Sequence, residues 1–534
     1  MNKLALKGMT AMLCAMAICT IFSCDDKDKD PAVVNVTSIT LDKTSAQLEP
    51  GGTLTLVATV LPAEADNKNV NWSSSAEAVA TVSQAGAVAA IAPGEAVITA
   101  KTVDGNLTAT CTLTVKEGTP PATAVVLQGE ITTNLTLRAI DQNTLKGFVY
   151  VADGATLTIE PGAVVKGEKA SMGSLIVERG GKIIAEGTSD KPIVFTSDQP
   201  KGARSYGDWG GLILCGKAPT NNTSEPQIEG GPRSKYGGTD PADNSGILKY
   251  VRIEFAGYPF EPNKEINGLT CGGVGSGTTI EYVQVSYCGD DSFEWFGGTV
   301  NARHLIAYKG WDDEFDTDYG FSGKLQFLLG VRDPRHADTS KSNGFESDND
   351  ANGSTNQPLT TPVFSNVTLI GPLYGVSDGK AQDDILYNTE DAANGAKGGQ
   401  FQAAMHIRRN SSLNVYNSVF AGWPYGLNLD KANEGAVVKN VIFAGMWKNF
   451  QNDAGSAYFQ TTALGNISIA STNDVLARDG DYTSVVAAQI GGADFSDTAI
   501  SGSFFEKVTY KGAFSGTSDW TAGWANFDPN NADY

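Results

Sequence analysis

A step of 22 residues in the middle of the chain constrains its fold more than any other feature. The phrase CGDDSFE, which begins at Cys288, returns as KGWDDEFD, which begins at Lys309. In a right-handed parallel β-helix, equivalent residues of successive coils stack about 4.8 Å apart, so a fixed step of this size is expected. The positions that recur are Asp290 and Asp312, Asp291 and Asp313, Phe293 and Phe315, and Glu294 and Asp316.

The surrounding sequence supports stacked coils. Val283, Leu305 and Phe327 follow the same step, and Val419 and Val441 show it again. Short β-branched runs such as TLTI and SLIV alternate with Gly, Asn and Asp, and no long helical periodicity interrupts them. We therefore predict an all-β chain whose larger part is a right-handed parallel β-helix of about 22 residues per coil.

Residues 33–116 show a different pattern. Short stretches alternate between apolar and polar residues, turn residues separate them at intervals of roughly 8–12 positions, and Trp72 lies near the middle. This pattern is typical of a small β-sandwich. The phrases EPGGTLTL, VLPAEA, VNWSSS, VATVSQAGAV and APGEAVITA follow the order of bacterial Ig-like group 2 domains, which the region resembles. The resemblance implies a spacer or adhesive module.

The larger part of the chain resembles the pectin-lyase-like superfamily through its stacked repeat. The repeat segment and the ending DWTAGWANFDPNNADY also resemble a family of exported bacterial β-helix proteins with no assigned activity. The expected organisation is a signal peptide at 1–23, an acidic leash at 24–32, an Ig-like domain at 33–116, a linker at 117–124, and a β-helix with a C-terminal cap at 125–534.

The N-terminus predicts export. Lys3 and Lys7 precede an apolar stretch that is too short to span a bilayer, as in a cleaved signal peptide. The stretch ends in IFSC, which resembles a lipobox and implies acylation of Cys24; an ordinary signal peptide is the alternative. The run DDKDKD that follows resembles the acidic tag of Gram-negative lipoproteins that face outward. We expect an outer-membrane lipoprotein that faces the cell exterior rather than the periplasm.

Charge and motif content exclude several classes of function. The net charge of −21 argues against a nucleic-acid partner, because phosphate binding requires clustered Lys and Arg. The sequence has no GxSxG, no Walker loop and no GxGxxG that precedes a helix, so neither a nucleophilic hydrolase nor a nucleotide ligand is expected. The cysteines that follow Cys24 have no CxxC spacing, which disfavours zinc. Cys271 and Cys288 form either a disulfide or buried free thiols.

The stacked aspartates predict a place for a divalent cation. Carboxylates that lie so close to one another raise one another's pKa or require a counter-ion. Ca²⁺ is a suitable counter-ion because it prefers oxygen ligands. The alternative is that these residues are turn formers that point into water. The candidate Ca²⁺ ligands are Asp290, Asp291, Asp312, Asp313 and Asp316, with Asp318, Glu346, Asp348 and Asp350 in nearby turns.

The same acids allow an enzyme. Lyases of the pectin-lyase-like fold use Ca²⁺ to neutralise a uronate and Arg or Lys to remove a proton, and its hydrolases use aspartate pairs. No signature of either class can be transferred residue by residue. If the chain is an enzyme, the catalytic candidates are Lys309, Arg332, Arg335, Asp290 and Asp312.

Tryptophans near the acidic turns suggest a glycan platform, because sugar rings stack on exposed aromatic faces. Phe293 and Phe315, in contrast, are expected to form a buried stack. The tryptophan candidates are Trp295, Trp311, Trp423 and Trp447. The sequence favours a non-catalytic surface lipoprotein that binds extracellular polysaccharide or another surface ligand. A Ca²⁺-dependent lyase or a glycoside hydrolase is the alternative, and a structural stalk is the third.

Overall fold

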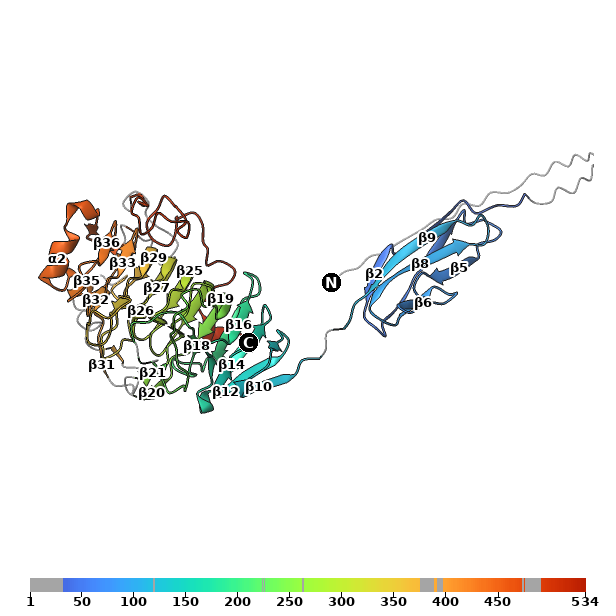
Figure 1. Ribbon diagram of the computed structural model, residues 1–534. Coiled ribbons are helices and arrows are strands. Elements are labelled where there is room, and N and C mark those ends of the chain that lie inside the picture. Colours follow the sequence, from blue (N-terminus) through green and yellow to red (C-terminus); the bar gives the residue numbers. More distant parts are fainter. Residues whose placement is uncertain are drawn as a thin grey trace, which may run out of the picture. The chain divides into compact units, whose positions relative to one another are not determined.

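The computed structural model describes residues 32–118, 121–222, 224, 226–261, 264–374, 389–390, 397–472, 475 and 491–534. The chain divides into two compact units, and the boundary in the sequence falls between Pro121 and Ala122 (Figure 1). The described helices are all too short, or too polar, to cross a bilayer. Cys24, the predicted lipidation site, lies outside the described residues.

The first unit is an Ig-like sandwich of short strands. Its core contains Trp72, Ile98 and Leu113, which are buried because alternate residues of each strand face inward. The strand orders are β1-β4, β2-β9-β8-β5 and β3-β7-β6. The strands are β1 (Ser38–Leu41), β2 (Ser45–Leu48), β3 (Thr53–Thr55), β4 (Ala58–Leu61), β5 (Val70–Ser74), β6 (Ala80–Val82), β7 (Ala87–Ala90), β8 (Gly94–Thr102) and β9 (Thr108–Val115).

The second unit is a parallel β-helix, as predicted, in which each strand pairs with its counterparts in the coils before and after it (Figure 1). It begins with β10 (Ala124–Ile131), β11 (Leu135–Leu137) and β12 (Gln142–Val151). The strands then stack in rows. The first row contains β15 (Ser174–Val177), β18 (Leu212–Cys215), β22 (Leu269–Gly272), β24 (Phe293–Phe296), β26 (Phe315–Asp318), β28 (Phe345–Ser347), β32 (Ala403–Arg408), β35 (Tyr425–Asp430) and β38 (Lys448–Phe450).

Five long strands cross from the second row to the third: β19 (Gly246–Glu254), β23 (Thr279–Ser286), β25 (Asn301–Tyr308), β27 (Lys324–Val331) and β29 (Val363–Ile370). Elsewhere these rows have separate strands. The second contains β13 (Thr156–Ile159), β16 (Lys182–Glu186), β33 (Asn414–Tyr416) and β36 (Val437–Lys439). The third contains β14 (Val164–Gly167), β17 (Ile193–Ser197), β34 (Val419–Ala421), β37 (Ile442–Ala444) and β39 (Ile467–Ile469).

Each long strand bends at one residue with a left-handed backbone, which re-aims the chain from one row to the next. Tyr282, His304 and Phe327 hold φ angles of 55°, 56° and 61°. Their rings stack outside the coils, with centroids 4.3 Å apart for Tyr282 and His304 and 5.1 Å apart for His304 and Phe327. A left-handed backbone is strained for residues with a side chain, and the ring stacking offsets part of that strain.

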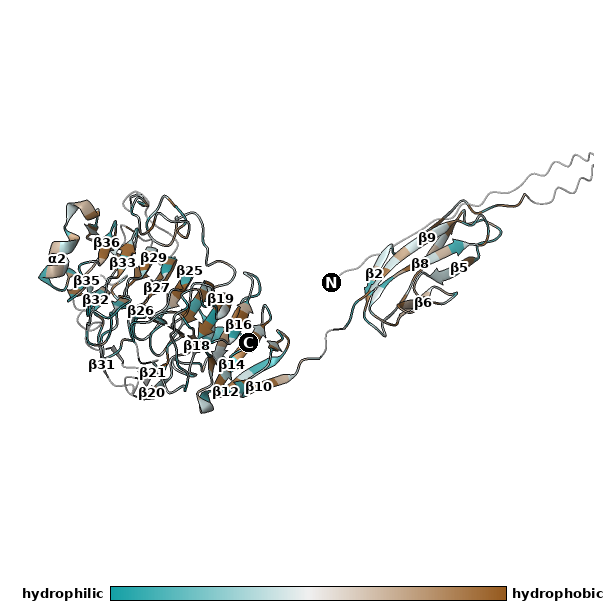
Figure 2. Ribbon diagram, in the orientation of Figure 1, coloured by the Kyte–Doolittle hydropathy of each residue, from teal (hydrophilic) through white to brown (hydrophobic). Residues whose placement is uncertain are grey.

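Apolar side chains fill the coils, and Figure 2 shows hydrophobic residues alternating with hydrophilic ones along the strands. Phe293, Phe315 and Phe345 occupy equivalent positions of successive coils and are fully buried. The centroids of Phe293 and Phe315 lie 5.5 Å apart, which confirms the predicted aromatic stack. Burying each such side chain contributes about 1.5–3 kcal/mol.

The 22-residue step recurs along the β-helix, as at Leu135 with Leu157 and Met405 with Leu427, but it does not hold in every coil. Phe293 pairs with Phe315 at this step, but Phe345 follows 30 residues after Phe315. The predicted partner Phe327 is wrong by one residue, because Leu305 pairs with Leu328 after a longer turn. In the same way Val419 pairs with Ile442 and not with Val441. Turns of different length separate the strands, so the coil has no single size.

Short elements lie outside the coils. They are the pairs β20 (Pro259–Glu261) with β21 (Lys264–Glu265) and β30 (Thr389–Glu390) with β31 (Lys397–Gly399), the helix α2 (Asp453–Phe459), and the 3₁₀ turns η1 (Lys169–Ser171), η2 (Thr462–Leu464) and η4 (Pro529–Asn531). The Asn452 side chain caps α2 by accepting a hydrogen bond from the Gly455 backbone N–H.

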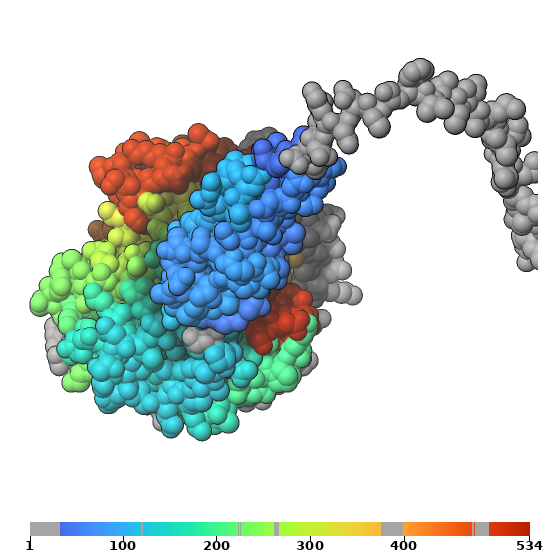
Figure 3. All heavy atoms as spheres, turned by 90° about the vertical axis from the view of Figure 1, so that its right-hand side faces the viewer, coloured from blue at the N-terminus to red at the C-terminus, as the bar shows by residue number. Residues whose placement is uncertain are grey.

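The segment 491–534 runs back along the β-helix. The Gln326 amide donates to the Glu506 carbonyl at 2.8 Å and accepts from the Glu506 N–H at 2.8 Å, and Gln284 binds the backbone of Asn526 in the same two-way manner. The chain ends at Tyr534, whose hydroxyl donates to Glu254 of β19. Figure 3 shows the C-terminal residues against the early coils.

Candidate functional site

The outer face of the first row gathers ionisable side chains. Side chains alternate between the two faces of a strand. Phe293, Phe315 and Phe345 point inward, so the next residue of each strand points outward. The parallel register places outward residues of successive coils side by side. We call the following set the charged strip: Glu294 of β24, Asp316 and Asp318 of β26, Glu346 of β28, Asp348 directly after it, and His406 and Arg408 of β32.

The turns before these strands carry a second set of acids that bind backbone. The Asp313 N–H donates to Asp291 Oδ1 at 2.7 Å, and the Asn343 N–H donates to Asp313 Oδ1. The Ala403 N–H donates to Asn343 Oδ1 at 3.1 Å in the next coil. Because Asn343 occupies the same position in this ladder as the aspartates, one oxygen of each aspartate links its coil to the next.

The predicted Ca²⁺ ligands lie together. In each of three groups, one carboxylate oxygen from every member lies within 4.8 Å of the others. This geometry adds Glu294 to the predicted ligands and includes Glu346, which was expected in a nearby turn. The groups are Asp290 with Asp291 and Asp312, Asp291 with Glu294 and Asp316, and Asp313 with Asp316 and Glu346.

Burial and mutual repulsion raise the pKa of these carboxyls. Burial is the larger cause, and the neighbouring carboxylates add to it. Burial, with a contribution from Asp338, raises the pKa of Asp312 to about 7. The groups raised well above their usual range are Asp291, Glu294, Asp313, Asp316 and Asp318.

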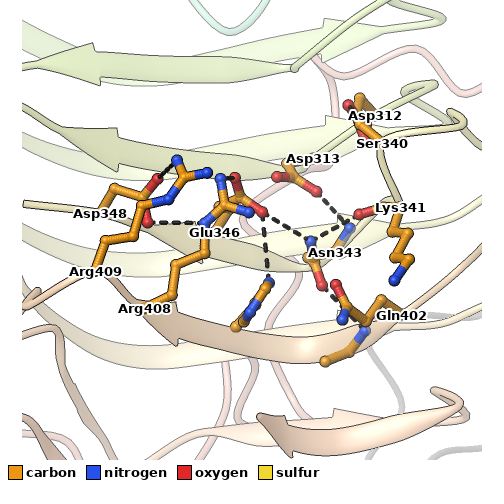
Figure 4. A network of polar contacts seen from close by, with 12 residues as sticks. Asp312, Asp313, Ser340, Lys341, Asn343, Glu346, Asp348, Gln402, Arg408 and Arg409 are labelled. Carbon is orange, nitrogen blue, oxygen red and sulfur yellow. Dashed lines mark hydrogen bonds and ion pairs between the residues drawn. The ribbon is translucent and has the colours of Figure 1, made fainter. Parts of the chain in front are cut away.

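Two arginines neutralise the other end of the charged strip (Figure 4). Arg408 contacts Glu346 Oε1 and donates through Nε to Asp348 Oδ1 at 2.8 Å. Arg409 reaches Asp348 Oδ2 at 2.7 Å. Within the parts of the chain that the structure describes, no basic side chain pairs with Glu294, Asp316 or Asp318.

A polar cavity of about 440 Å³ continues the strip past His406. Its walls carry amide, carboxyl, guanidinium and ammonium groups, so they offer both donors and acceptors to a ligand rich in hydroxyls. Its lining residues are Ser340, Lys341, Gln402, His406, Arg408, Asn428, Asp430, Gln451 and Asn452.

Two protein families match the chain. Residues 129–525 match the pectate-lyase-like beta helix domain, and residues 35–113 match the bacterial Ig-like domain of group 2. The first match covers most of the 534 residues. The chain belongs to the pectate-lyase-like β-helix family. The resemblances to the pectin-lyase-like superfamily and to bacterial Ig-like group 2 domains are therefore confirmed.

Individual relatives match only a short part of the chain. An Ig-like virion protein of Serratia phage KSP90 is 46% identical over 85 residues, which is 16% of this chain and 33% of the phage protein. Two uncharacterised proteins of Clostridium acetobutylicum are 44% and 41% identical over 89 and 86 residues, or 9% and 22% of their lengths. The chain thus spans a third or less of these relatives.

The basic residues predicted as catalytic candidates contact other groups in the structure. Arg332 is fully buried, pairs with Glu314 at 2.6 Å and donates to backbone carbonyls, so it is part of the scaffold. Arg335 pairs with Asp333 at 2.7 Å. Lys309 lies over the Tyr308 ring, 4.9 Å from its centroid. In this pectate-lyase-like β-helix, Arg332 and Arg335 are thus held in ion pairs and Lys309 lies against an aromatic ring.

Most of the predicted tryptophan platform is wrong. Trp295, Trp311 and Trp423 are 1%, 8% and 0% exposed, because their positions face the interior or a covered turn. A buried ring cannot present its face to a sugar. Trp447 is half-buried, and its ring lies 5.9 Å from that of Tyr425. Trp447 remains a candidate.

The cysteines are free. Cys271 and Cys288 are both fully buried, and each thiol stays unpaired with another cysteine. Burial raises the pKa of both thiols, which makes them unreactive packing residues. The free-thiol alternative therefore holds.

The sequence pattern did not predict that His406 and Arg408 lie beside the acids of the charged strip. His406 is only 6% exposed, and Arg408 binds two carboxylates. The alternation of His406 and Arg408 mirrors that of Glu346 and Asp348 in the register. That signal lies 60 residues away along the chain, so no short repeat reveals it.

Proposed function

We propose that this protein is a non-catalytic surface lipoprotein whose β-helix binds extracellular polysaccharide, or another surface ligand, along the charged strip and its polar cavity. The observation that carries the proposal is the cavity itself. It is about 440 Å³ in volume, it is polar on every side, and it is continuous with an outward-facing row of acids. Such walls suit sugar hydroxyls better than an apolar ligand.

The Ig-like module supports a role at a surface. The matched family is a bacterial Ig-like one, and one relative is a virion protein by name. Export and acylation at Cys24 would place the chain on the outer membrane, facing the exterior. Replacing Cys24→Ser should release the protein from membranes and abolish labelling by radioactive palmitate; a membrane-bound, labelled variant would contradict the anchor.

The ligand proposal is tested by affinity gels that contain acidic or neutral polysaccharides, with the full chain and added Ca²⁺. Lys341 and Asp430 are exposed and line the cavity, so the double variant Lys341→Ala, Asp430→Ala should lose retardation without loss of stability. The matched control is Lys146→Ala, Asp153→Ala, which removes the same charges from the first coils. Equal retardation of both variants would overturn the cavity as the site.

An enzyme is the second candidate, since paired carboxyls with raised pKa values can hold or donate protons near neutral pH. The same mixtures distinguish it. New absorbance from unsaturated products would show a lyase, and new reducing ends without that absorbance would show a hydrolase. Retardation without product supports binding alone. No signal in any channel would favour a structural stalk.

We also propose Ca²⁺ as a ligand of the acidic turns. Asp312 Oδ1 and Asp316 Oδ1 are buried without a hydrogen-bond partner, and carboxylate oxygens are what Ca²⁺ prefers. The double variant Asp290→Ala, Asp312→Ala should lower the melting temperature in Ca²⁺ but not in a chelator. Equal losses in both conditions would contradict this site.

A further inference from the structure

One group of acids in the charged strip lies beside an imidazole. The carboxylates of Asp313, Asp316 and Glu346 each offer an oxygen within 4.8 Å of the other two. The Nδ1 atom of His406 lies 3.6 Å from Glu346 Oε2, a separation longer than a hydrogen bond. An imidazole nitrogen therefore lies beside one carboxylate of this three-oxygen group.

His406 is the independent observation that points to a ligand. Its side chain is 7% exposed, and neither ring nitrogen has a hydrogen-bond partner. Buried polar atoms are nearly always satisfied, because an unpaired one loses its hydration without compensation. Asp316 Oδ1, in the same group, is buried and unpartnered as well. Two unpaired acceptors beside further carboxylates call for a positive ligand.

We propose that Asp313, Asp316, Glu346 and His406 bind a divalent transition metal of the Mn²⁺ or Zn²⁺ class. The imidazole decides the class, since neutral imidazole suits transition metals and Ca²⁺ takes oxygen ligands. Ligands on opposite sides of such an ion lie about 4.2 Å apart, given metal–ligand bonds of about 2.1 Å. The three carboxylates have this spacing, and His406 would join them by a side-chain rotation from its place beside Glu346.

Neighbouring residues hold the ligands in place. Arg408 contacts Glu346 Oε1, and the Asn343 amide donates to Glu346 Oε2 at 3.3 Å. Such outer contacts orient a carboxylate toward a metal. His406 also lines the polar cavity, so the ion would lie at the cavity's edge, where water or a ligand hydroxyl could complete its coordination.

The experiment uses Mn²⁺ alone, with the full chain and no polysaccharide, so its outcome is separate from that of the ligand proposal. Electron paramagnetic resonance measures free Mn²⁺ during titration. The wild-type chain should bind Mn²⁺, and His406→Asn should weaken that binding at least tenfold while Ca²⁺ affinity changes less than threefold. The matched control is His336→Asn, which removes an imidazole 3.5 Å from Asp333 but away from the group; it should leave Mn²⁺ affinity unchanged.

A second measurement needs no variant. Spin-echo modulation of bound Mn²⁺ reports nitrogen-14 in its coordination shell, so the wild-type complex should show imidazole modulation. Bound Mn²⁺ without nitrogen modulation would overturn the proposal in favour of an oxygen-only site. So would absent Mn²⁺ binding, or equal affinity in wild type and His406→Asn, because His406 would then be an unpaired packing residue.

Discussion

The two ends of the charged strip have carboxyls at the same strand positions, but among the described residues only one end has basic side chains that pair with them. At one end, Glu346 and Asp348 face Arg408, whose guanidinium comes from the next coil. At the other, Asp316 and Asp318 have no basic partner among the described side chains, and burial raises their pKa. One end is neutralised by the chain itself, whereas the other requires protons or a bound cation.

The comparison separates two uses of one scaffold. Stacked coils bring equivalent side chains close whether or not their charges agree, because the backbone ladder sets the spacing. Where the next coil supplies an arginine, the acids become structural. Where it supplies another acid, the repulsion persists until something outside the chain relieves it. A ligand is therefore expected at the acidic end.

Among the substitutions, the largest effect should come from removing the internal cation. Arg408→Met leaves Glu346 and Asp348 without their main partner, so the free energy of unfolding should fall by about 3 kcal/mol. Urea unfolding measures it. The control is Arg409→Met, since this side chain is 43% exposed and contacts only Asp348; its loss should stay below about 1 kcal/mol. Equal losses would show that Arg408 does not neutralise this end.

The second prediction concerns pH at the acidic end. The folded state keeps protons that the unfolded chain loses near pH 4, because burial raises these pKa values, in Asp312 to about 7. Unfolding then becomes easier as pH rises from about 4 through 7, by about 1.4 kcal/mol per pH unit for each proton retained. Melting curves in a chelator should show this decline, and a bound divalent cation should flatten it. A chelated protein whose stability rises over that window would refute the protonated acids.

The smallest expected effect is on the free energy of unfolding of two single variants, which should change in opposite directions. Asp316→Asn removes a carboxyl that must ionise without a partner, so at pH 8 in a chelator it should stabilise the fold by about 1 kcal/mol. Glu346→Gln, at the equivalent position one coil on, should destabilise it by a similar amount, because it deprives Arg408 of a carboxylate. Chemical denaturation of both variants tests this. Shifts of the same sign would mean that the two ends do not differ.

Sequence reasoning reached the architecture because the evidence for it is local. The recurrence of Asp290 at Asp312, and of Phe293 at Phe315, is visible in the letters and requires stacked coils of strands. The alternation around Trp72 likewise predicted the Ig-like unit. The predicted acid cluster followed from the same repeat, since equal positions in neighbouring coils must approach one another.

Tertiary structure decided everything that depends on unequal turns and on which way a side chain faces. His406 meets Glu346 only because the coil between them is far longer than the repeat, so its register cannot be read from a fixed step. Trp295 looked like a surface residue because acids precede it, yet strand alternation turns it inward. Sequence spacing determines which coils stack, whereas the lengths of the turns determine which charges meet.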